Sequence, residues 1–334
     1  MPLNHGCVYH DRVRPCAAGM SVLAYHVAHF RHSDEATWRS SIAAGRVRVN
    51  DRIAVAEERL RSGDRLEFRR APWNEPPAPL AFGVAHEDEH VLVLLKPAGL
   101  QVLPAGPFHE HTLVRLVRRS APGRAESSPV HRLGRGTSGL ILFGKTSAAR
   151  AGLARQFREG RAQKTYLALA QGCALPASCM ARHPIGPVAV GPWHTYAVAP
   201  DGKPALTRLR VLARDASHSC SLVAAQPITG RPNQIRIHLA ACGAPLVGDP
   251  VYGPGGLPGQ IPSAEGDYFL HAASLGFTHP ETKRWTKLHS WPVWLGARPL
   301  LGASPAPVSW FSSDLPSVPR DSAVSSALDY AARR

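Results

Sequence analysis

The residues that could carry chemistry gather near the middle of the chain, in H-R-L-G-R-G-T-S-G-L at 131–140, hereafter the central motif. It holds an imidazole, two guanidinium groups and two hydroxyls, but no acid. Between positions 122 and 151 the carboxylate of Glu126 is the one acidic group. Gly134 has no side chain, so it can neither attack a substrate nor hold a proton. The motif therefore supplies positive charge, which suits an anionic ligand.

The charge of the whole chain points the same way. Its 39 Lys and Arg against 24 Asp and Glu give a net charge of +15. Positions 110–172 contain 12 basic residues and three acids, a net +9, so the excess is concentrated around the central motif. We expect a nucleic acid as the partner. A solvated basic surface, or an arginine-rich composition without function, is the alternative.

The sequence lacks the residue patterns of metal sites, phosphate-binding loops, hydrolase active sites and membrane spans. The six cysteines form no C-x-x-C pair and no metal-ligand set with histidine, so we expect no metal and reduced thiols. Reduced thiols favour an intracellular, reducing compartment, either the cytoplasm or an organelle such as a chloroplast or mitochondrion. The sequence has no Gly-rich phosphate loop and no hydrolase elbow. No apolar run approaches the roughly 18 residues of a membrane span.

Composition divides the chain into four regions. Positions 1–71 are expected to form a small α+β domain. Positions 72–79 are rich in proline, which favours an extended and stiff linker. Positions 80–300 form the large domain. Positions 301–334 are rich in Ser, Pro and Ala without periodicity, which predicts a disordered tail.

Local patterns predict the main elements. In the small domain we expect a helix over 38–45 that ends at a glycine, a strand over 46–50 with a turn at Asn50-Asp51, and a turn and strand within 60–68. The large domain has a helical pattern over 147–159 with Gly160 as its stop. Its short apolar runs predict strands at 91–95, 140–143, 166–170, 206–212 and 221–225. Strands with few helices indicate an α+β fold with a mixed, mainly antiparallel sheet.

Six segments in order resemble the RluA-type pseudouridine synthases, enzymes that turn uridine into pseudouridine within RNA. They lie at 94–104, 131–140, 164–169, 230–239, 245–253 and 270–280. The central motif and P-W-N-E-P at 72–76 resemble a plant-type subgroup of that family in particular. The glycine and strand pattern of the small domain resembles an S4 RNA-binding module, with a generic small α+β domain as the alternative. The resemblance implies the pseudouridine synthase fold over 80–300.

The resemblance also implies roles for individual residues. Gly134 occupies the position where the family has a catalytic aspartate. Tyr166 matches a tyrosine that stacks on the uracil, and Arg236 matches an arginine that pairs with the aspartate. Arg132 matches an arginine that enters the space vacated in the RNA. Further RNA contacts are expected at His131, Arg135, Arg231, Asn233, Gln234, Lys96, Arg46 and Arg48.

Two functions follow from these residues. The chain is an RNA pseudouridine synthase that recruits a carboxylate from Asp249, Asp215 or Glu126, or it is an inactive RNA-binding relative, because Gly134 offers no acid. Asp249 and Tyr252 also fit a plain structural role, since Gly-Asp-Pro is typical of a turn. We expect a monomer that needs no cofactor, because the isomerisation involves no net redox change and no group donor.

Overall fold

The computed structural model describes residues 4–30, 33–190, 193–259 and 268–295, and the expected tail at 301–334 lies outside them. The chain divides into two compact units, Met1–Pro76 and Pro77–Arg334. Their boundary falls inside the Pro-rich stretch 72–79. Each unit has a buried core of its own.

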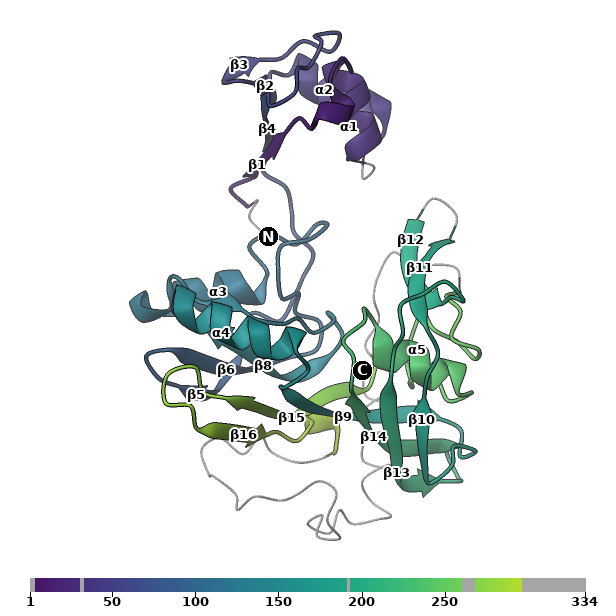
Figure 1. The fold of residues 1–334 in the computed structure, drawn as a ribbon. Coiled ribbons are helices and arrows are strands. Elements are labelled where there is room, and N and C mark those ends of the chain that lie inside the picture. Colours follow the sequence, from purple (N-terminus) through teal and green to yellow (C-terminus); the bar gives the residue numbers. More distant parts are fainter. Residues whose placement is uncertain (1–3, 31–32, 191–192, 260–267, 296–334) are drawn as a thin grey trace. The chain divides into compact units, whose positions relative to one another are not determined.

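The small unit combines a four-stranded antiparallel sheet with two α-helices (Figure 1). The strand order is β1-β4-β2-β3. Its elements are β1 (Cys7–Arg12), η1 (Pro15–Ala17), α1 (Val22–His29), α2 (Glu35–Ala43), β2 (Val47–Val49), β3 (Arg52–Ile53) and β4 (Arg65–Arg70). The unit is an α+β domain, and its relation to S4 modules stays a prediction.

Local sequence explains the turns of the small unit. The side chain of Asp34 accepts a hydrogen bond from the backbone N–H of Thr37, so α2 begins one turn earlier than expected. The chain leaves α2 through Gly45, whose φ is +68°. Asn50 and Asp51 have φ of 48° and 69°, as a two-residue hairpin turn requires. The expected strand and turn are therefore confirmed as the β2–β3 hairpin.

The large unit is built on a ten-stranded sheet with three α-helices (Figure 1). Eight strands follow the order β10-β13-β14-β9-β15-β8-β6-β5, while β16 pairs with β15 and β7 pairs with β8. The sheet strands are β5 (Gly83–Glu87), β6 (Val91–Lys96), β7 (Ser128–Pro129), β8 (Ser138–Gly144), β9 (Gln163–Gln171), β10 (Ser178–Ala181), β13 (Thr207–Asp215), β14 (Cys220–Pro227), β15 (Leu270–Thr278) and β16 (Trp285–His289). A separate hairpin joins β11 (Ile185–Val190) and β12 (Trp193–Val198), and the helices are α3 (Leu113–Ser120), α4 (Ser147–Arg158), α5 (Gln234–Ala241), η2 (Pro122–Arg124) and η3 (Val293–Leu295).

The centre of the sheet joins segments that are far apart in the sequence. β15 lies between β9 and β8, antiparallel to the first and parallel to the second. Ala272 of β15 is opposite both Tyr166 and Gly139. A Cβ atom on Gly139 would lie 2.4 Å from the carbonyl oxygen of Ala272, so this approach requires glycine. The other strand pairs among the described residues are antiparallel, which confirms the mixed, mainly antiparallel sheet.

Alternation along β6 explains how the helices cover the sheet. Leu92 and Leu94 pack in one cluster with Leu113 of α3, whereas Val91 and Val93 pack in another with Leu153 of α4. Successive side chains of a strand point to opposite faces. The sheet is therefore covered on both faces, and α5 joins the α3 side through Ile235 and Leu239.

A buried lysine ties the end of β6 to the central motif. Lys96 is 2% exposed, and its ammonium donates to the carbonyl oxygens of Pro97, Leu100 and Arg135 at 2.8, 2.7 and 2.9 Å. The backbone N–H of Gly99 also donates to the Arg135 carbonyl at 2.9 Å. The lysine therefore fixes the motif, and an RNA contact at Lys96 stays a prediction.

An ion cluster fixes the edge of the same unit. Arg124 and Lys145 donate to Oε1 of Glu87 at 3.1 and 2.9 Å. The pKa of Glu87 is lowered from 4.5 to about 2, mainly by the hydrogen bond from Arg124. Burial opposes this shift, and the hydrogen bond from Lys145 reinforces it. The cluster links β5 to the segments before and after β8.

Replacing Lys96 by Met should lower the free energy of unfolding by about 2–3 kcal/mol, because three carbonyl groups lose a charged donor. Urea unfolding followed by circular dichroism measures the loss. Arg158→Met is the matched control, since Arg158 is exposed on α4 and its loss should change stability by less than about 0.5 kcal/mol. Equal unfolding midpoints for both variants would show that the lysine is dispensable.

Replacing Glu87 by Gln should lower stability at pH 7 by about 1–2 kcal/mol, a value reduced for solvent screening. The pKa of Glu87 is lowered on folding, so its contribution is present above pH 4.5 and is lost as the pH falls toward 2. Unfolding at pH 7, 4 and 2 should show the two proteins converging at the lowest pH. Glu89→Gln, in the exposed part of the same loop, is the control. A difference that is constant with pH would contradict this origin.

Candidate active site

The central motif leaves β7, forms a loop and enters β8 at Ser138. His131 accepts a hydrogen bond from the backbone N–H of Leu142 at 3.0 Å, and its ring stacks on Phe157 at 4.5 Å. Burial, with a smaller effect from the Lys164 charge, lowers the pKa of His131 to about 3. The imidazole is neutral and holds the loop against β8, and an RNA contact at His131 stays a prediction.

The two arginines of the motif are placed differently from the histidine. Arg132 is exposed. Arg135 is half-buried, with its guanidinium 5.5 Å from the centroid of the Phe108 ring. Both bring positive charge to the surface beside Gly134.

A buried ion pair lies at the centre of the site. Arg236, on α5, donates from Nε to Oδ2 and from Nη2 to Oδ1 of Asp249, both at 2.8 Å. Both side chains are almost inaccessible, with exposures of 3% and 1%. The backbone N–H groups of Val251 and Tyr252 also donate to Oδ1, at 3.0 and 3.1 Å. The Gly-Asp-Pro segment is thus part of a turn, which fits the structural role considered for it above. It also supplies Asp249, the partner of Arg236.

Two tyrosine rings enclose the guanidinium of Arg236. Its Cζ lies 4.8 Å from the centroid of the Tyr252 ring and 4.2 Å from that of the Tyr268 ring. Such contacts stabilise a desolvated cation. Sequence reasoning missed Tyr268, because a single tyrosine two residues before a strand carries no spacing signal.

Tyr268 also reaches the central motif. Its hydroxyl lies 3.1 Å from Oγ1 of Thr137, and either oxygen can donate. The same hydroxyl lies 2.6 Å from the point where a Cβ atom on Gly134 would be. Tyr268 therefore contacts both Arg236 and the motif, two segments about 100 positions apart in the sequence.

Tyr166 packs into the same region. It lies on β9, is 8% exposed, and shares a core cluster with Leu133, Ile235 and Tyr268. Burial raises the pKa of Tyr166, so the phenol keeps its proton at neutral pH. Tyr166 thus packs in one cluster with Leu133 and Ile235, which directly precede Gly134 and Arg236 in the sequence.

The three candidate carboxylates are in very different places. Asp249 is bonded to Arg236. Asp215 is opposite Cys220 at the β13–β14 turn and accepts hydrogen bonds from Ser217, whereas Tyr166 is opposite Ala225. Five residues of strand separate these positions by roughly 16 Å. Glu126 is exposed in the loop before β7.

The segment before α5 has a structural role. Asn233 has φ of 54° and donates to the hydroxyl of Tyr252 at 3.0 Å. Gln234 is 4% exposed and donates to the carbonyl oxygen of Leu206 and to Oγ1 of Thr207, both at 2.9 Å. An RNA contact at Gln234 stays a prediction.

The remaining expected RNA contacts are more accessible. Arg231 is half-buried, and its Nε donates to the carbonyl oxygen of Pro204 at 3.0 Å. In the small unit, Arg46 is exposed, while Arg48 is half-buried and donates to the carbonyl oxygen of Asp51 at 3.3 Å. RNA contacts at these three arginines stay predictions.

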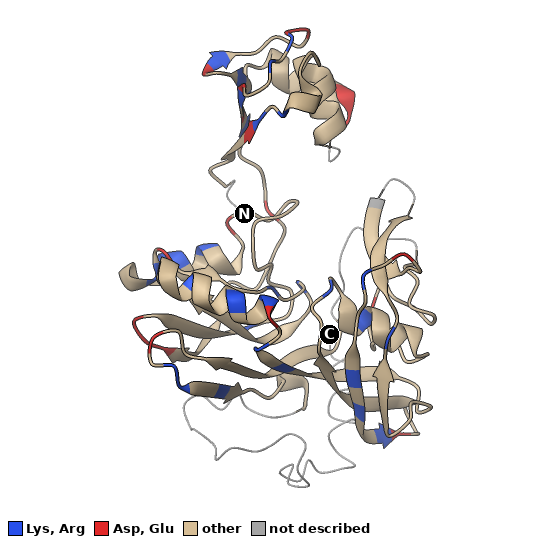
Figure 2. Ribbon diagram, in the orientation of Figure 1, with Lys and Arg blue, Asp and Glu red and all other residues tan. Residues whose placement is uncertain are grey.

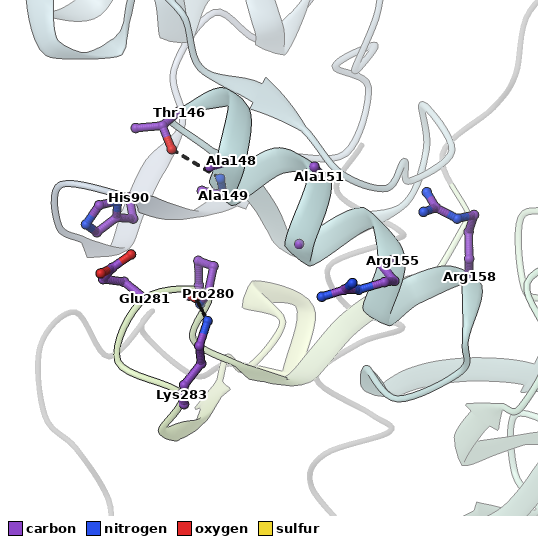
Figure 3. Close-up of a pocket in the computed structure, with 11 residues that line it drawn as sticks. His90, Thr146, Ala148, Ala149, Ala151, Arg155, Arg158, Pro280, Glu281 and Lys283 are labelled. Atoms are coloured by element: carbon purple, nitrogen blue, oxygen red, sulfur yellow. Dashed lines mark hydrogen bonds between the residues drawn. The ribbon is translucent and has the colours of Figure 1, made fainter.

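A separate hollow of about 590 Å³ lies beside α4 and the β15–β16 turn (Figure 3). Arg155, Arg158 and Lys283 contribute positive charge to its wall, and Glu281 contributes one acid. Figure 2 shows basic residues on α4 and on β13. The wall includes none of the central motif, so this hollow is distinct from the Arg236 site.

Within the described residues, no group of three or more His, Cys, Asp or Glu could hold a metal ion. The structure records all six cysteines as free. No helix in the described ranges is both long and apolar enough to cross a membrane.

Comparison with known proteins gives consistent matches. The RNA pseudouridylate synthase family model matches residues 90–241. A Synechocystis protein, named an uncharacterised RNA pseudouridine synthase, is 38% identical over 271 residues, covering 80% of this chain and 92% of that protein. RNA pseudouridine synthase 5 of Arabidopsis thaliana is 37% identical, covering 83% of this chain and 84% of that protein.

Relatives with lower identity also match. The ribosomal large subunit pseudouridine synthase D of Neisseria meningitidis is 34% identical, covering 78% of this chain and 72% of that protein. Among solved structures, human RNA pseudouridylate synthase domain containing 1 has a TM-score of 0.54 at 28% identity, covering 66% of this chain and 87% of that one. The expected fold and family are thus confirmed, and the chain belongs to the RluA-type RNA pseudouridine synthases.

Proposed function

We propose that this protein isomerises uridine to pseudouridine in a structured RNA, with Arg236–Asp249 as the charged centre of the site and Tyr166 as the ring that meets the uracil. The observation that supports it is the buried pair, joined by two hydrogen bonds of 2.8 Å. Arg236 has its carboxylate although Gly134 supplies none. Asp249 therefore takes the position of ion-pair partner that the family gives to another aspartate.

The reaction sets clear demands on the site. The bond between C1′ of the ribose and N1 of uracil breaks, the uracil turns, and C1′ joins C5. The proton leaves C5, and N1 gains one, so no donor or oxidant is consumed. The target uridine must first leave its stack, at a cost of a few kcal/mol. A carboxylate near the sugar can serve this chemistry as a nucleophile or as a base.

The two carboxylate oxygens of Asp249 accept different numbers of hydrogen bonds. Oδ1 accepts from Arg236, Val251 and Tyr252, whereas Oδ2 accepts from Arg236 alone. A carboxylate oxygen has two lone pairs. Oδ2 is thus the atom of Asp249 that can meet the sugar or the departing C5 proton when the RNA has opened the site.

Four features of the wider setting belong to the same proposal. The protein acts as a monomer and without a cofactor, because the reaction is an internal rearrangement. Its RNA target is ribosomal RNA, transfer RNA or messenger RNA, a choice that depends on surface shape. Its compartment is a reducing one, the cytoplasm or a plastid, which the free cysteines and the plant and cyanobacterial relatives support.

Pseudouridine formation tests the proposal. The purified protein is incubated with cellular RNA, and pseudouridine is counted by mass spectrometry after digestion. Asp249→Asn and Tyr166→Phe should each lower turnover by at least about 10³-fold, as expected for groups that act together on the reacting atoms. Both variants keep the shape of the side chain, and their melting temperatures show whether they fold.

Asp215→Asn and Glu126→Gln are the matched controls, because Arg236 donates its hydrogen bonds to Asp249 and not to these carboxylates. Both should retain the turnover of the wild type. Undiminished product from Asp249→Asn would exclude this carboxylate. No product from the folded wild type, with RNA still bound, would instead fit an inactive RNA-binding relative.

RNA binding should depend strongly on salt, because phosphate contacts release counterions. Replacing the exposed Arg132 by Ala should weaken binding and reduce the slope of log K against log[salt] by about one. Filter binding between 50 and 300 mM KCl measures both quantities. Arg46→Ala tests separately whether the small unit contributes to binding. A slope unchanged by Arg132→Ala would remove this residue from the RNA contact.

A further inference from the structure

The space next to Gly134 is filled by a side chain from another part of the sequence. A Cβ atom on Gly134 would lie 2.6 Å from the Tyr268 hydroxyl and 3.3 Å from Oγ1 of Thr137. The backbone at Gly134 is not among the positive-φ glycines, so its conformation would accept other residues. What excludes a larger residue at this position is therefore the Tyr268 side chain and not the backbone.

Tyr268 cannot easily move away from this position. It is 4% exposed and packs in the cluster that contains Leu133 and Tyr166. Its hydroxyl is bonded to Thr137 at 3.1 Å, and the centroid of its ring lies 4.2 Å from Cζ of Arg236. A tyrosine has two side-chain torsions and a rigid ring, so a contact at both ends fixes it.

We propose that Tyr268 is a positioning residue. Its side chain fills the space that an acid at position 134 would need, and it contacts both Arg236 and the central motif. Its ring holds the guanidinium of Arg236 on one side. Its hydroxyl holds the central motif through Thr137. This inference rests on the proposed function, in which Arg236 takes its carboxylate from Asp249.

The proposal explains why glycine and Asp249 occur together in one site. With Tyr268 in place, a side chain at 134 would collide with the phenol oxygen. Arg236 nevertheless needs an anion, because a buried guanidinium without a partner is strongly destabilising. Asp249 supplies that anion by accepting hydrogen bonds from Nε and Nη2 of the guanidinium, and the backbone of its own turn supplies further donors to the carboxylate.

Thermal unfolding of four proteins tests the steric part. The proteins are the wild type, Gly134→Asp, Tyr268→Phe and the double variant. Gly134→Asp should lower the melting temperature by about 5 °C or more, because it overfills a packed site. The double variant should regain at least half of that loss, since the colliding oxygen is gone. An unchanged melting temperature for Gly134→Asp, or additive losses in the double variant, would overturn the proposal.

Turnover tests the contact with Arg236. Tyr268→Leu removes the ring and should lower kcat about tenfold with KM for RNA nearly unchanged. Tyr268→Phe keeps the ring, and its kcat should stay at least threefold above that of Tyr268→Leu. Phe269→Leu is the matched control, because this neighbouring ring packs on Trp294 and not on Arg236. Equal kcat for Tyr268→Leu and Phe269→Leu would show that the Tyr268 ring does not position the guanidinium.

The two readouts separate this inference from the proposed function. If the wild type forms no pseudouridine, the proposed function fails, while the melting temperatures still decide whether Tyr268 fills the space at 134. If the wild type is active and the double variant melts no higher than Gly134→Asp, only the role of Tyr268 is refuted.

Discussion

The site depends on one interaction, the buried ion pair between Arg236 and Asp249. Removing two charges from water costs several kcal/mol for each ion, and only good geometry with further hydrogen bonds compensates it. Here two parallel hydrogen bonds join the pair, and two backbone N–H groups complete one carboxylate oxygen. The pair thereby fixes α5 against the turn that follows it, and everything else in the site is arranged around this fixed point.

The family pattern and this chain meet the same electrostatic requirement in different ways. A buried guanidinium needs an anion, but the fold does not prescribe which segment of the chain supplies it. In this protein the central motif supplies backbone and surface cations, while the acid comes from the turn at Asp249. The loss of an acid at one position is therefore not by itself evidence of an inactive enzyme.

Sequence patterns predicted helices and strands better than they predicted which side chains meet in the site. The helix over 147–159 is found as α4, and the expected strands at 91–95 and 166–170 are found within β6 and β9, because alternation and helix stops are local signals. The position of Tyr268 was not predictable, since it depends on β15 lying between β9 and β8. The surroundings of Lys96 were not predictable either, because nothing local shows that three carbonyl groups surround its ammonium.

The parallel pairing of β15 with β8 has a consequence for folding during translation. β8 and β9 emerge about 100 residues or more before β15, the strand that separates them in the sheet. Contacts between such distant segments form slowly, because a long loop must close first. A nascent chain that ends before position 270 therefore exposes the unpaired backbone edges of β8 and β9, and Tyr268 joins Arg236 only when this last part of the sheet is made.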